Sequence, residues 1–147
     1  MIITSSAFEH NASIPGKFTC TGGDVNPELL IQNVPASAKS LTLIVDDPDA
    51  SRGTTFTHWL VWNIDPATQV IKEESVPPRS IEGITDFVRI GYGGPCPPSG
   101  KPHRYFFKLY ALNIVLDLPE GASKADLEAE IEKHLIEKAE LVGLYAR

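Results

Sequence analysis

Residues 41–64 read LTLIVDDPDASRGTTFTHWLVWNI, two apolar runs separated by a polar loop. The runs, 41–45 and 58–64, are short and contain β-branched or aromatic residues, which is typical of buried strands. The loop between them holds a proline and a glycine and is longer than a tight hairpin turn. The pattern therefore predicts two neighbouring strands joined by an irregular connection.

Further strands are predicted on both sides of this region. Residues 104–112 are rich in aromatics and are predicted as a strand that leads into 113–118, and residues 85–90 form another apolar run. Two segments, 16–21 and 29–32, are weaker strand candidates. The 12 prolines and 11 glycines favour a loop-rich, mostly β protein over a helical bundle.

One helix is well marked near the C-terminus. Ser123 is followed three positions later by Asp126, as in a capping box. Apolar residues then recur four apart, as on one face of a helix, at Leu127, Ile131, Leu135 and Ala139. Gly143 is a suitable terminator, and a last short strand can follow it. Several strands and one late helix predict a β-rich α+β fold.

The composition limits the classes of function. The 147 residues suit one domain, residues 1–147, and the apolar and charged fractions of 42% and 22% are those of a globular protein. The formal net charge is -6 and no cluster of lysine or arginine is present, so no nucleic-acid partner is expected. We find no secretory signal and no apolar run that could form a membrane span, so the expected location is cytoplasmic.

Polar side chains are predicted to converge at one edge of the sheet. Asp47 and Asp49 follow the first strand, and His58 opens the second. If these strands are antiparallel neighbours, the end of one and the start of the other meet at the same edge. His103 precedes a later strand in the same way, and Gly94 lies in the loop before it. Loops held by a rigid sheet are the usual place for a binding site.

Two loop segments near this edge each allow two interpretations. Asp47-Pro48-Asp49 fits an ordinary proline turn, which the trans preference favours, or a cis Asp47–Pro48 bond that fixes both carboxylate directions. Residues 91–98, GYGGPCPP, combine glycines with stiffening prolines. Their backbone N–H groups can form a cavity for an anion, or the segment can be a rigid turn without a ligand. No Gly-Lys-Ser/Thr follows, so this is not a nucleotide-binding fingerprint.

These segments resemble the signature regions of the phosphatidylethanolamine-binding protein family, which includes Raf kinase inhibitor-like proteins, in its prokaryotic branch. The likeness covers nearly the full length and rests on four motifs: Asp47-Pro48-Asp49-Ala50, Phe56-Thr57-His58-Trp59-Leu60, Gly94-Pro95-Cys96-Pro97-Pro98 and Pro102-His103-Arg104-Tyr105. The resemblance implies an antiparallel β-sandwich with one C-terminal helix. It also implies a small pocket for phosphate-like anions or phospholipid headgroups.

By motif position, the resemblance places six residues in that pocket: Asp47, Asp49, His58, Gly94, His103 and Tyr105. It further implies that the bond before Pro48 is cis and that Cys20 and Cys96 are neighbours, with a disulfide between them left open. Two cysteines this far apart do not form a zinc motif. We therefore expect no metal and no other cofactor.

The favoured function is a binding module and not an enzyme. Protonated His58 or His103, the Tyr105 hydroxyl and the Gly94 N–H would donate to a phosphate-like anion or a phosphorylated small molecule. Asp47 would orient an imidazole and raise its pKa. The resemblance also implies a protein partner, a kinase or a protease, whose activity is modulated. A homodimer stays open.

Two enzymatic alternatives are weighed against the binding module. The aspartates and histidines can ligate zinc with an open water position, as in a metal-dependent hydrolase. Cys96 with His103 as its base can form a cysteine hydrolase, which needs an accessible thiolate. The aspartates and histidines come from three segments without a ligand-spacing motif, and prolines flank Cys96. Both alternatives are therefore less favoured.

Overall fold

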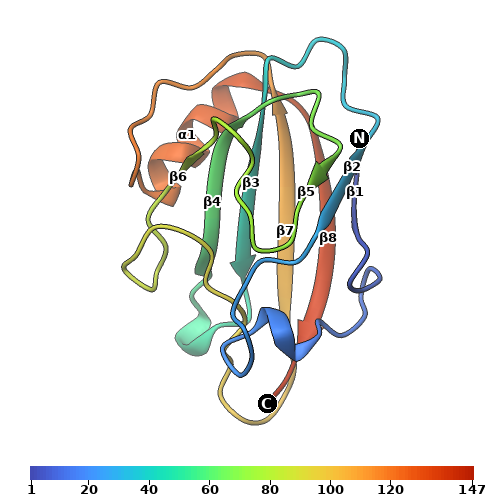
Figure 1. Cartoon of the computed structure of the whole chain (residues 1–147). Coiled ribbons are helices and arrows are strands. Elements are labelled where there is room, and N and C mark those ends of the chain that lie inside the picture. The colour runs from blue at the N-terminus through green and yellow to red at the C-terminus, as the bar shows by residue number, and fades with distance from the viewer.

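The chain folds into two antiparallel sheets and one α-helix (Figure 1). The computed structural model describes residues 1–147, apart from the side chain of Arg52. The larger sheet has the order β6 (Ile81–Glu82), β4 (Phe56–Ile64), β3 (Ser40–Asp47), β7 (His103–Leu112) and β8 (Leu135–Tyr145). The smaller has the order β1 (Ile2–Ser5), β2 (Leu29–Gln32) and β5 (Val70–Ile71). The predicted β-rich α+β sandwich is confirmed.

The predicted pairing of the first two strands is also confirmed. β3 and β4 are antiparallel, and Asp47 at the end of β3 pairs with Phe56 at the start of β4. β7 lies antiparallel on the other side of β3, with Asp46 opposite Phe106. The end of β3 and the starts of β4 and β7 therefore meet at one end of the sheet, which is the lower end in Figure 1.

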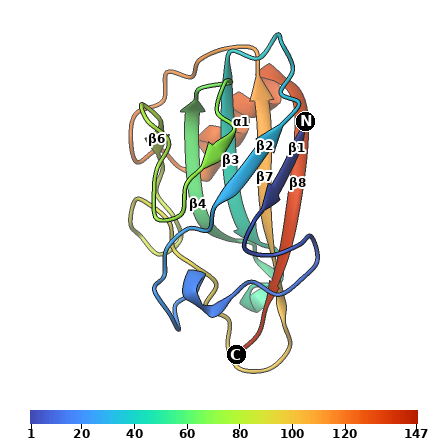
Figure 2. The same ribbon diagram turned by 45° about the vertical axis from the view of Figure 1, so that its right-hand side comes forward.

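Each face of the five-stranded sheet is covered by a different layer, which Figure 2 shows from the side. The smaller sheet covers one face, and the core between the sheets includes Leu43, Val45 and Trp59. Helix α1 (Lys124–His134) covers the other face, where Ile44 packs with Leu127. Successive residues of a strand point to opposite faces, so β3 can be buried along its whole length.

The helix begins where the sequence predicts and ends earlier. Ser123 is its N-cap, and the Ser123 hydroxyl accepts a hydrogen bond from the N–H of Asp126. The predicted continuation through Ala139 to Gly143 is wrong, because the chain turns into β8 at Leu135. β8 pairs with β7 along nearly its whole length, and this ladder outweighs the helical propensity of its residues. No helix in the described residues is long and apolar enough to cross a membrane.

Two other predicted strands are absent from the structure. Residues 85–90 form a turn that is closed by a single bridge between Ile84 and Ile90. The weak candidate 16–21 contains the 3-10 helix η1 (Gly16–Phe18), whereas the candidate 29–32 is β2. A second 3-10 helix, η2 (Ser51–Gly53), lies in the loop between β3 and β4. The turn at 85–90 carries Phe87, whose ring contacts the rings of Phe56 and His58.

The prediction of a cis bond between Asp47 and Pro48 is wrong: this bond is trans. The chain reverses here by another device, because the Oδ1 atom of Asp47 accepts a hydrogen bond from the N–H of Asp49 at 2.7 Å. An aspartate bonded to the backbone two residues later is itself a turn. The loop therefore turns without the less favoured isomer.

Candidate functional site

A cavity of about 260 Å³ opens at the end of the sheet where β3 ends and β4 and β7 begin. Its polar lining residues are Asp47, Ser51, Thr54, His58, His103 and Tyr105. Its other lining residues are Ala50, Phe56, Phe87, Cys96, Pro97 and Pro98. Strand ends provide the titratable side chains, and loops provide most of the apolar walls. Four of the six predicted site residues therefore share one cavity.

Asp47 and His103 form a hydrogen-bonded pair in the cavity. The Nδ1 atom of His103 lies 2.7 Å from Oδ2 of Asp47, and both side chains are largely buried. A carboxylate only accepts, so Nδ1 carries a proton and the ring orientation is fixed. Asp47 thus orients an imidazole, as the sequence predicts. When His103 is protonated, the pair is an ion pair and its Nε2–H is a donor.

His58 is held differently. Its Nδ1 atom lies 2.7 Å from the backbone oxygen of Gly93, and its ring contacts the rings of Phe56, Phe87 and Tyr105. Burial lowers the pKa of His58 below its ordinary value of 6.5, although the Gly93 carbonyl and the Asp47 carboxylate oppose this. The expectation that a neighbouring carboxylate raises the pKa is therefore wrong for His58, because desolvation outweighs the attraction.

The hydroxyl of Tyr105 is buried beside these groups and has no hydrogen-bond partner among the described residues. Burial, and then the nearby carboxylate of Asp47, raise the pKa of Tyr105 far above its ordinary value of 10.0. The hydroxyl therefore keeps its proton and is a hydrogen-bond donor beside the Asp47 carboxylate. Because most buried polar groups are paired, an unpaired donor on a cavity wall is a group that a ligand oxygen can pair with.

Asp49 is not among the residues that line the cavity. Its carboxylate instead accepts three hydrogen bonds from Arg104, from the backbone N–H at 3.0 Å and from the guanidinium at 2.9 Å twice. Arg104 lowers the pKa of Asp49 from 3.8 to about 2. This pair connects the loop after β3 to the start of β7, so it supports the rim of the cavity.

Gly94 also lies outside the cavity. Its N–H donates to the Oδ1 atom of Asp24 at 2.7 Å, so the predicted donation of this group to an anion is not seen. A Cβ atom at this position would lie 2.2 Å from the backbone oxygen of Phe18. Gly94 is therefore a point of close backbone approach that fixes the loop 91–102 to the N-terminal segment.

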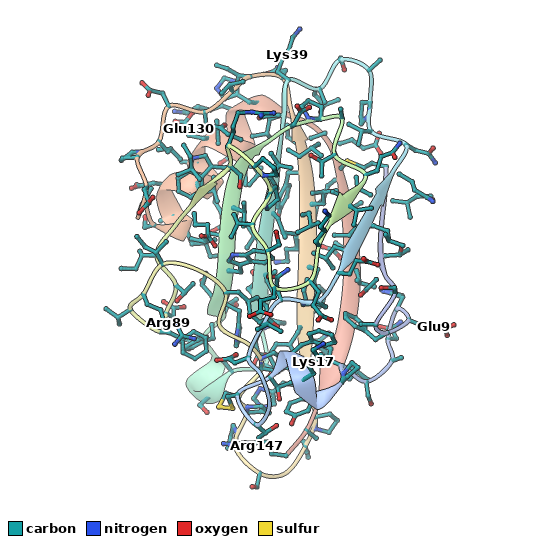
Figure 3. All side chains as sticks on the ribbon, in the orientation of Figure 1. Glu9, Lys17, Lys39, Arg89, Glu130 and Arg147 are labelled. Atoms are coloured by element: carbon teal, nitrogen blue, oxygen red, sulfur yellow. A yellow bond between two sulfur atoms is a disulfide. The ribbon has the colours of Figure 1, made fainter. Side chains whose placement is uncertain are left out.

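Cys20 and Cys96 are joined by a disulfide, with 5.4 Å between their Cα atoms. Its sulfur atoms are visible in yellow at the lower end of the molecule in Figure 3. The expected proximity is confirmed, and the open question of a bridge is answered. Because Cys96 lines the cavity, the disulfide fastens one wall of the site to the loop after η1.

The motifs that build this site are those of one family. Residues 4–146 match the sequence profile of the Phosphatidylethanolamine-binding protein family. The chain belongs to the phosphatidylethanolamine-binding protein family. A UPF0098 protein of Pyrococcus horikoshii is 51% identical over 150 residues, which cover 97% of this chain and 75% of the relative. A UPF0098 protein of Methanothermobacter thermautotrophicus is 45% identical, with 100% and 99% of the two chains covered.

Solved structures of the family have the same fold. The crystal structure of a phosphatidylethanolamine-binding protein homolog from Chlamydia trachomatis superposes with a TM-score of 0.94 at 38% identity. Escherichia coli YbcL, described as a member of the mammalian family, superposes with a TM-score of 0.93 at 30% identity. Both matches cover 99% of this chain and 97% of the other.

Sequence reasoning missed most of the apolar wall. Phe56 belongs to a quoted motif and could have been found from its place two residues before His58. Phe87 carried no such signal, because the segment around it was predicted as a strand and is a turn. Ala50, Ser51 and Thr54 come from the loop before β4, where no sequence pattern indicates which side chains face inward.

Proposed function

We propose that this protein binds a small oxyanion, such as a phosphate group on an apolar or headgroup-like carrier, in the cavity at the end of the sheet. The observation that supports this most is the buried Tyr105 hydroxyl, a donor on the cavity wall that has no hydrogen-bond partner among the described residues. His103 adds a second donor when it is protonated, since Asp47 holds its other ring nitrogen. An oxyanion would accept from both groups.

The walls of the cavity indicate what else the ligand carries. Phe56, Phe87 and Pro97 also line it, and ring contacts connect the two phenylalanines to His58. Apolar walls with a few convergent polar groups are typical of small-molecule sites. A ligand with an anionic head and a short apolar group therefore fits better than a free inorganic anion.

A binding role is also favoured over the two hydrolase readings. Among the described residues, no group of three or more His, Cys, Asp or Glu side chains is arranged to hold a metal ion. The sulfur of Cys96 is bonded to that of Cys20, so it has no thiolate to attack a substrate. Modulation of a kinase or a protease stays a prediction from the family resemblance, and a homodimer stays open.

Titration calorimetry with inorganic phosphate, phosphoethanolamine and phenyl phosphate tests the proposal. We expect phenyl phosphate to bind, and the substitution His103→Ala to weaken it by about 10- to 100-fold, the scale of one charged hydrogen bond. The control is His134→Ala, at the far end of the helix. Absence of binding by all three probes would refute the oxyanion site, and release of phenol would support a hydrolase.

A further inference from the structure

His58 presents only one ring nitrogen to the cavity. Its Nδ1 atom is 2.7 Å from the backbone oxygen of Gly93, and a carbonyl only accepts, so Nδ1 carries the proton. Its Nε2 atom has no partner among the described residues, and it is not one of their fully buried unpaired atoms. His58 lines the cavity, so Nε2 is the atom that a ligand can reach.

The surroundings of His58 favour the neutral ring. The side chain is 3% exposed and is packed among aromatic rings, with centroids 5.0 Å away for Phe56 and 5.3 Å for Phe87. Desolvation disfavours a charged imidazole, and the partner of Nδ1 is a neutral carbonyl and not a carboxylate. His103, by contrast, faces the carboxylate of Asp47. In neutral His58 the lone pair of Nε2 points outward as an acceptor.

The cavity therefore combines donors with one fixed acceptor. Tyr105 and protonated His103 donate, whereas Nε2 of His58 accepts. Building on the oxyanion site proposed above, we propose that His58 selects an oxyanion that still carries a hydroxyl proton. The ligand class is a phosphomonoester in its singly protonated form, and sulfate esters and phosphodiesters are rejected. Sulfate esters and phosphodiesters carry no hydroxyl proton as monoanions. They would place an anionic oxygen against the lone pair of Nε2 and leave this acceptor unpaired.

The expected discrimination is large because it concerns a buried hydrogen bond. A site that is built to pair with a ligand hydroxyl discriminates strongly against an analogue that lacks it. Phenyl phosphate and phenyl sulfate are matched probes, since both carry a ring for the Phe56 and Phe87 wall. The second ionisation of a phosphate ester has a pKa near 6, so close to pH 5.5 both probes are mostly monoanions. At that pH the main difference between them is the hydroxyl proton.

Calorimetry at pH 5.5 tests the selection. We expect phenyl phosphate to bind at least about tenfold more tightly than phenyl sulfate, with methyl phenyl phosphate, a diester, behaving like the sulfate. In His58→Asn the side-chain amide keeps an N–H toward Gly93 but lacks Nε2. In this variant the affinities for phenyl phosphate and phenyl sulfate should differ by no more than about threefold, because phenyl phosphate binds more weakly.

The outcomes separate this inference from the proposed function. If none of the probes binds, the oxyanion site itself is wrong. If phenyl phosphate and phenyl sulfate bind equally well to the unsubstituted protein, the site stands and the role of His58 is wrong. Nitrogen NMR of labelled histidine gives a second test that needs no variant. We expect an unprotonated Nε2 in the free protein that shifts as an acceptor when phenyl phosphate binds, and a protonated Nε2 in both states would overturn the inference.

Discussion

Asp46 and Asp47 are consecutive in β3, yet their carboxylates lie on opposite faces of the five-stranded sheet. Oδ2 of Asp46 is bonded beneath the helix, 3.1 Å from Nζ of Lys108 and 2.8 Å from Nζ of Lys124. Asp47 faces the cavity and is bonded to His103. The alternation of a strand thus gives one aspartate to the helix contact and the next to the site.

Substitution of these two residues should separate stability from binding. Asp46→Asn leaves two lysines without their shared, fully buried partner, so we expect the free energy of unfolding to fall by about 3 kcal/mol. Its affinity for phenyl phosphate should stay within about twofold, because Asp46 does not line the cavity. Urea denaturation and calorimetry on the same preparation measure the two quantities.

Asp47→Asn is the matched opposite case. It removes the charge that pairs with His103, so the affinity for phenyl phosphate should fall by about tenfold or more. The exposed Asp117 gives a control, because Asp117→Asn should change neither stability nor affinity. If Asp46→Asn weakened binding as much as Asp47→Asn does, the separation of the two faces would be refuted.

Tyr105→Phe should weaken binding without destabilising the fold. The hydroxyl has no hydrogen-bond partner among the described residues, so its removal breaks no hydrogen bond that they make. It also removes an unpaired buried group, which would raise the free energy of unfolding by up to about 1 kcal/mol. The affinity for phenyl phosphate should fall by about fivefold or more through the lost donor.

Tyr110→Phe is a suitable control for that measurement. Tyr110 lies on the helix-covered face, where burial, and next the carboxylate of Asp46, raise its pKa to about 12. Removal of the Tyr110 hydroxyl should leave the affinity for phenyl phosphate unchanged. A Tyr105→Phe protein that bound phenyl phosphate as tightly as the parent would show that this hydroxyl does not face the ligand.

The disulfide should contribute substantially to stability. Cys20 and Cys96 are 76 residues apart, and closing a loop of this size stabilises a fold by about 2–4 kcal/mol. Reduction should therefore lower the midpoint of guanidinium unfolding. The double variant Cys20→Ala, Cys96→Ala should unfold at the same midpoint with and without reductant. Two free thiols in the untreated protein, counted by mass spectrometry after alkylation, would contradict the bridge.

Most of the fold could be predicted because its central strands have unambiguous patterns. The runs that became β3, β4 and β7 are too apolar and β-branched or aromatic for surface segments. β8 could not be predicted, since Leu135–Tyr145 combines helix-forming residues with apolar spacing that also fits a helix. Only its pairing with β7, which depends on residues far away in sequence, decides the matter.

The site was predictable where it depends on strand ends and not where it depends on loops. Antiparallel pairing alone brings Asp47, His58 and His103 together. Two other contacts depend on loop conformations that no local pattern specifies: the hydrogen bond from Gly94 to Asp24 and the one from Arg104 to Asp49. Whether His58 is charged depends on how deeply it is buried, which becomes known only when the turn around Phe87 is placed.

The buried, neutral state of His58 should also appear in the pH dependence of stability. Its pKa is lowered from 6.5 in the folded protein, mainly by burial, so below pH 6.5 the unfolded chain binds more protons at this position. The free energy of unfolding should therefore fall as the pH drops from 6.5 toward the folded pKa, by at most about 1.4 kcal/mol per pH unit. Above pH 6.5 this contribution is fully present.

Urea denaturation at pH 8.0, 6.5 and 5.0 measures the effect as a difference between proteins, which cancels the titration of the carboxylates. His58→Asn should lose less stability between pH 6.5 and 5.0 than the parent protein, because asparagine does not titrate. The variant His134→Asn, at the end of the helix, should keep the slope of the parent. If the parent and His58→Asn lost equal stability over this range, His58 would have to be equally protonated in the folded and unfolded states. A cavity that holds this ring neutral would then be ruled out.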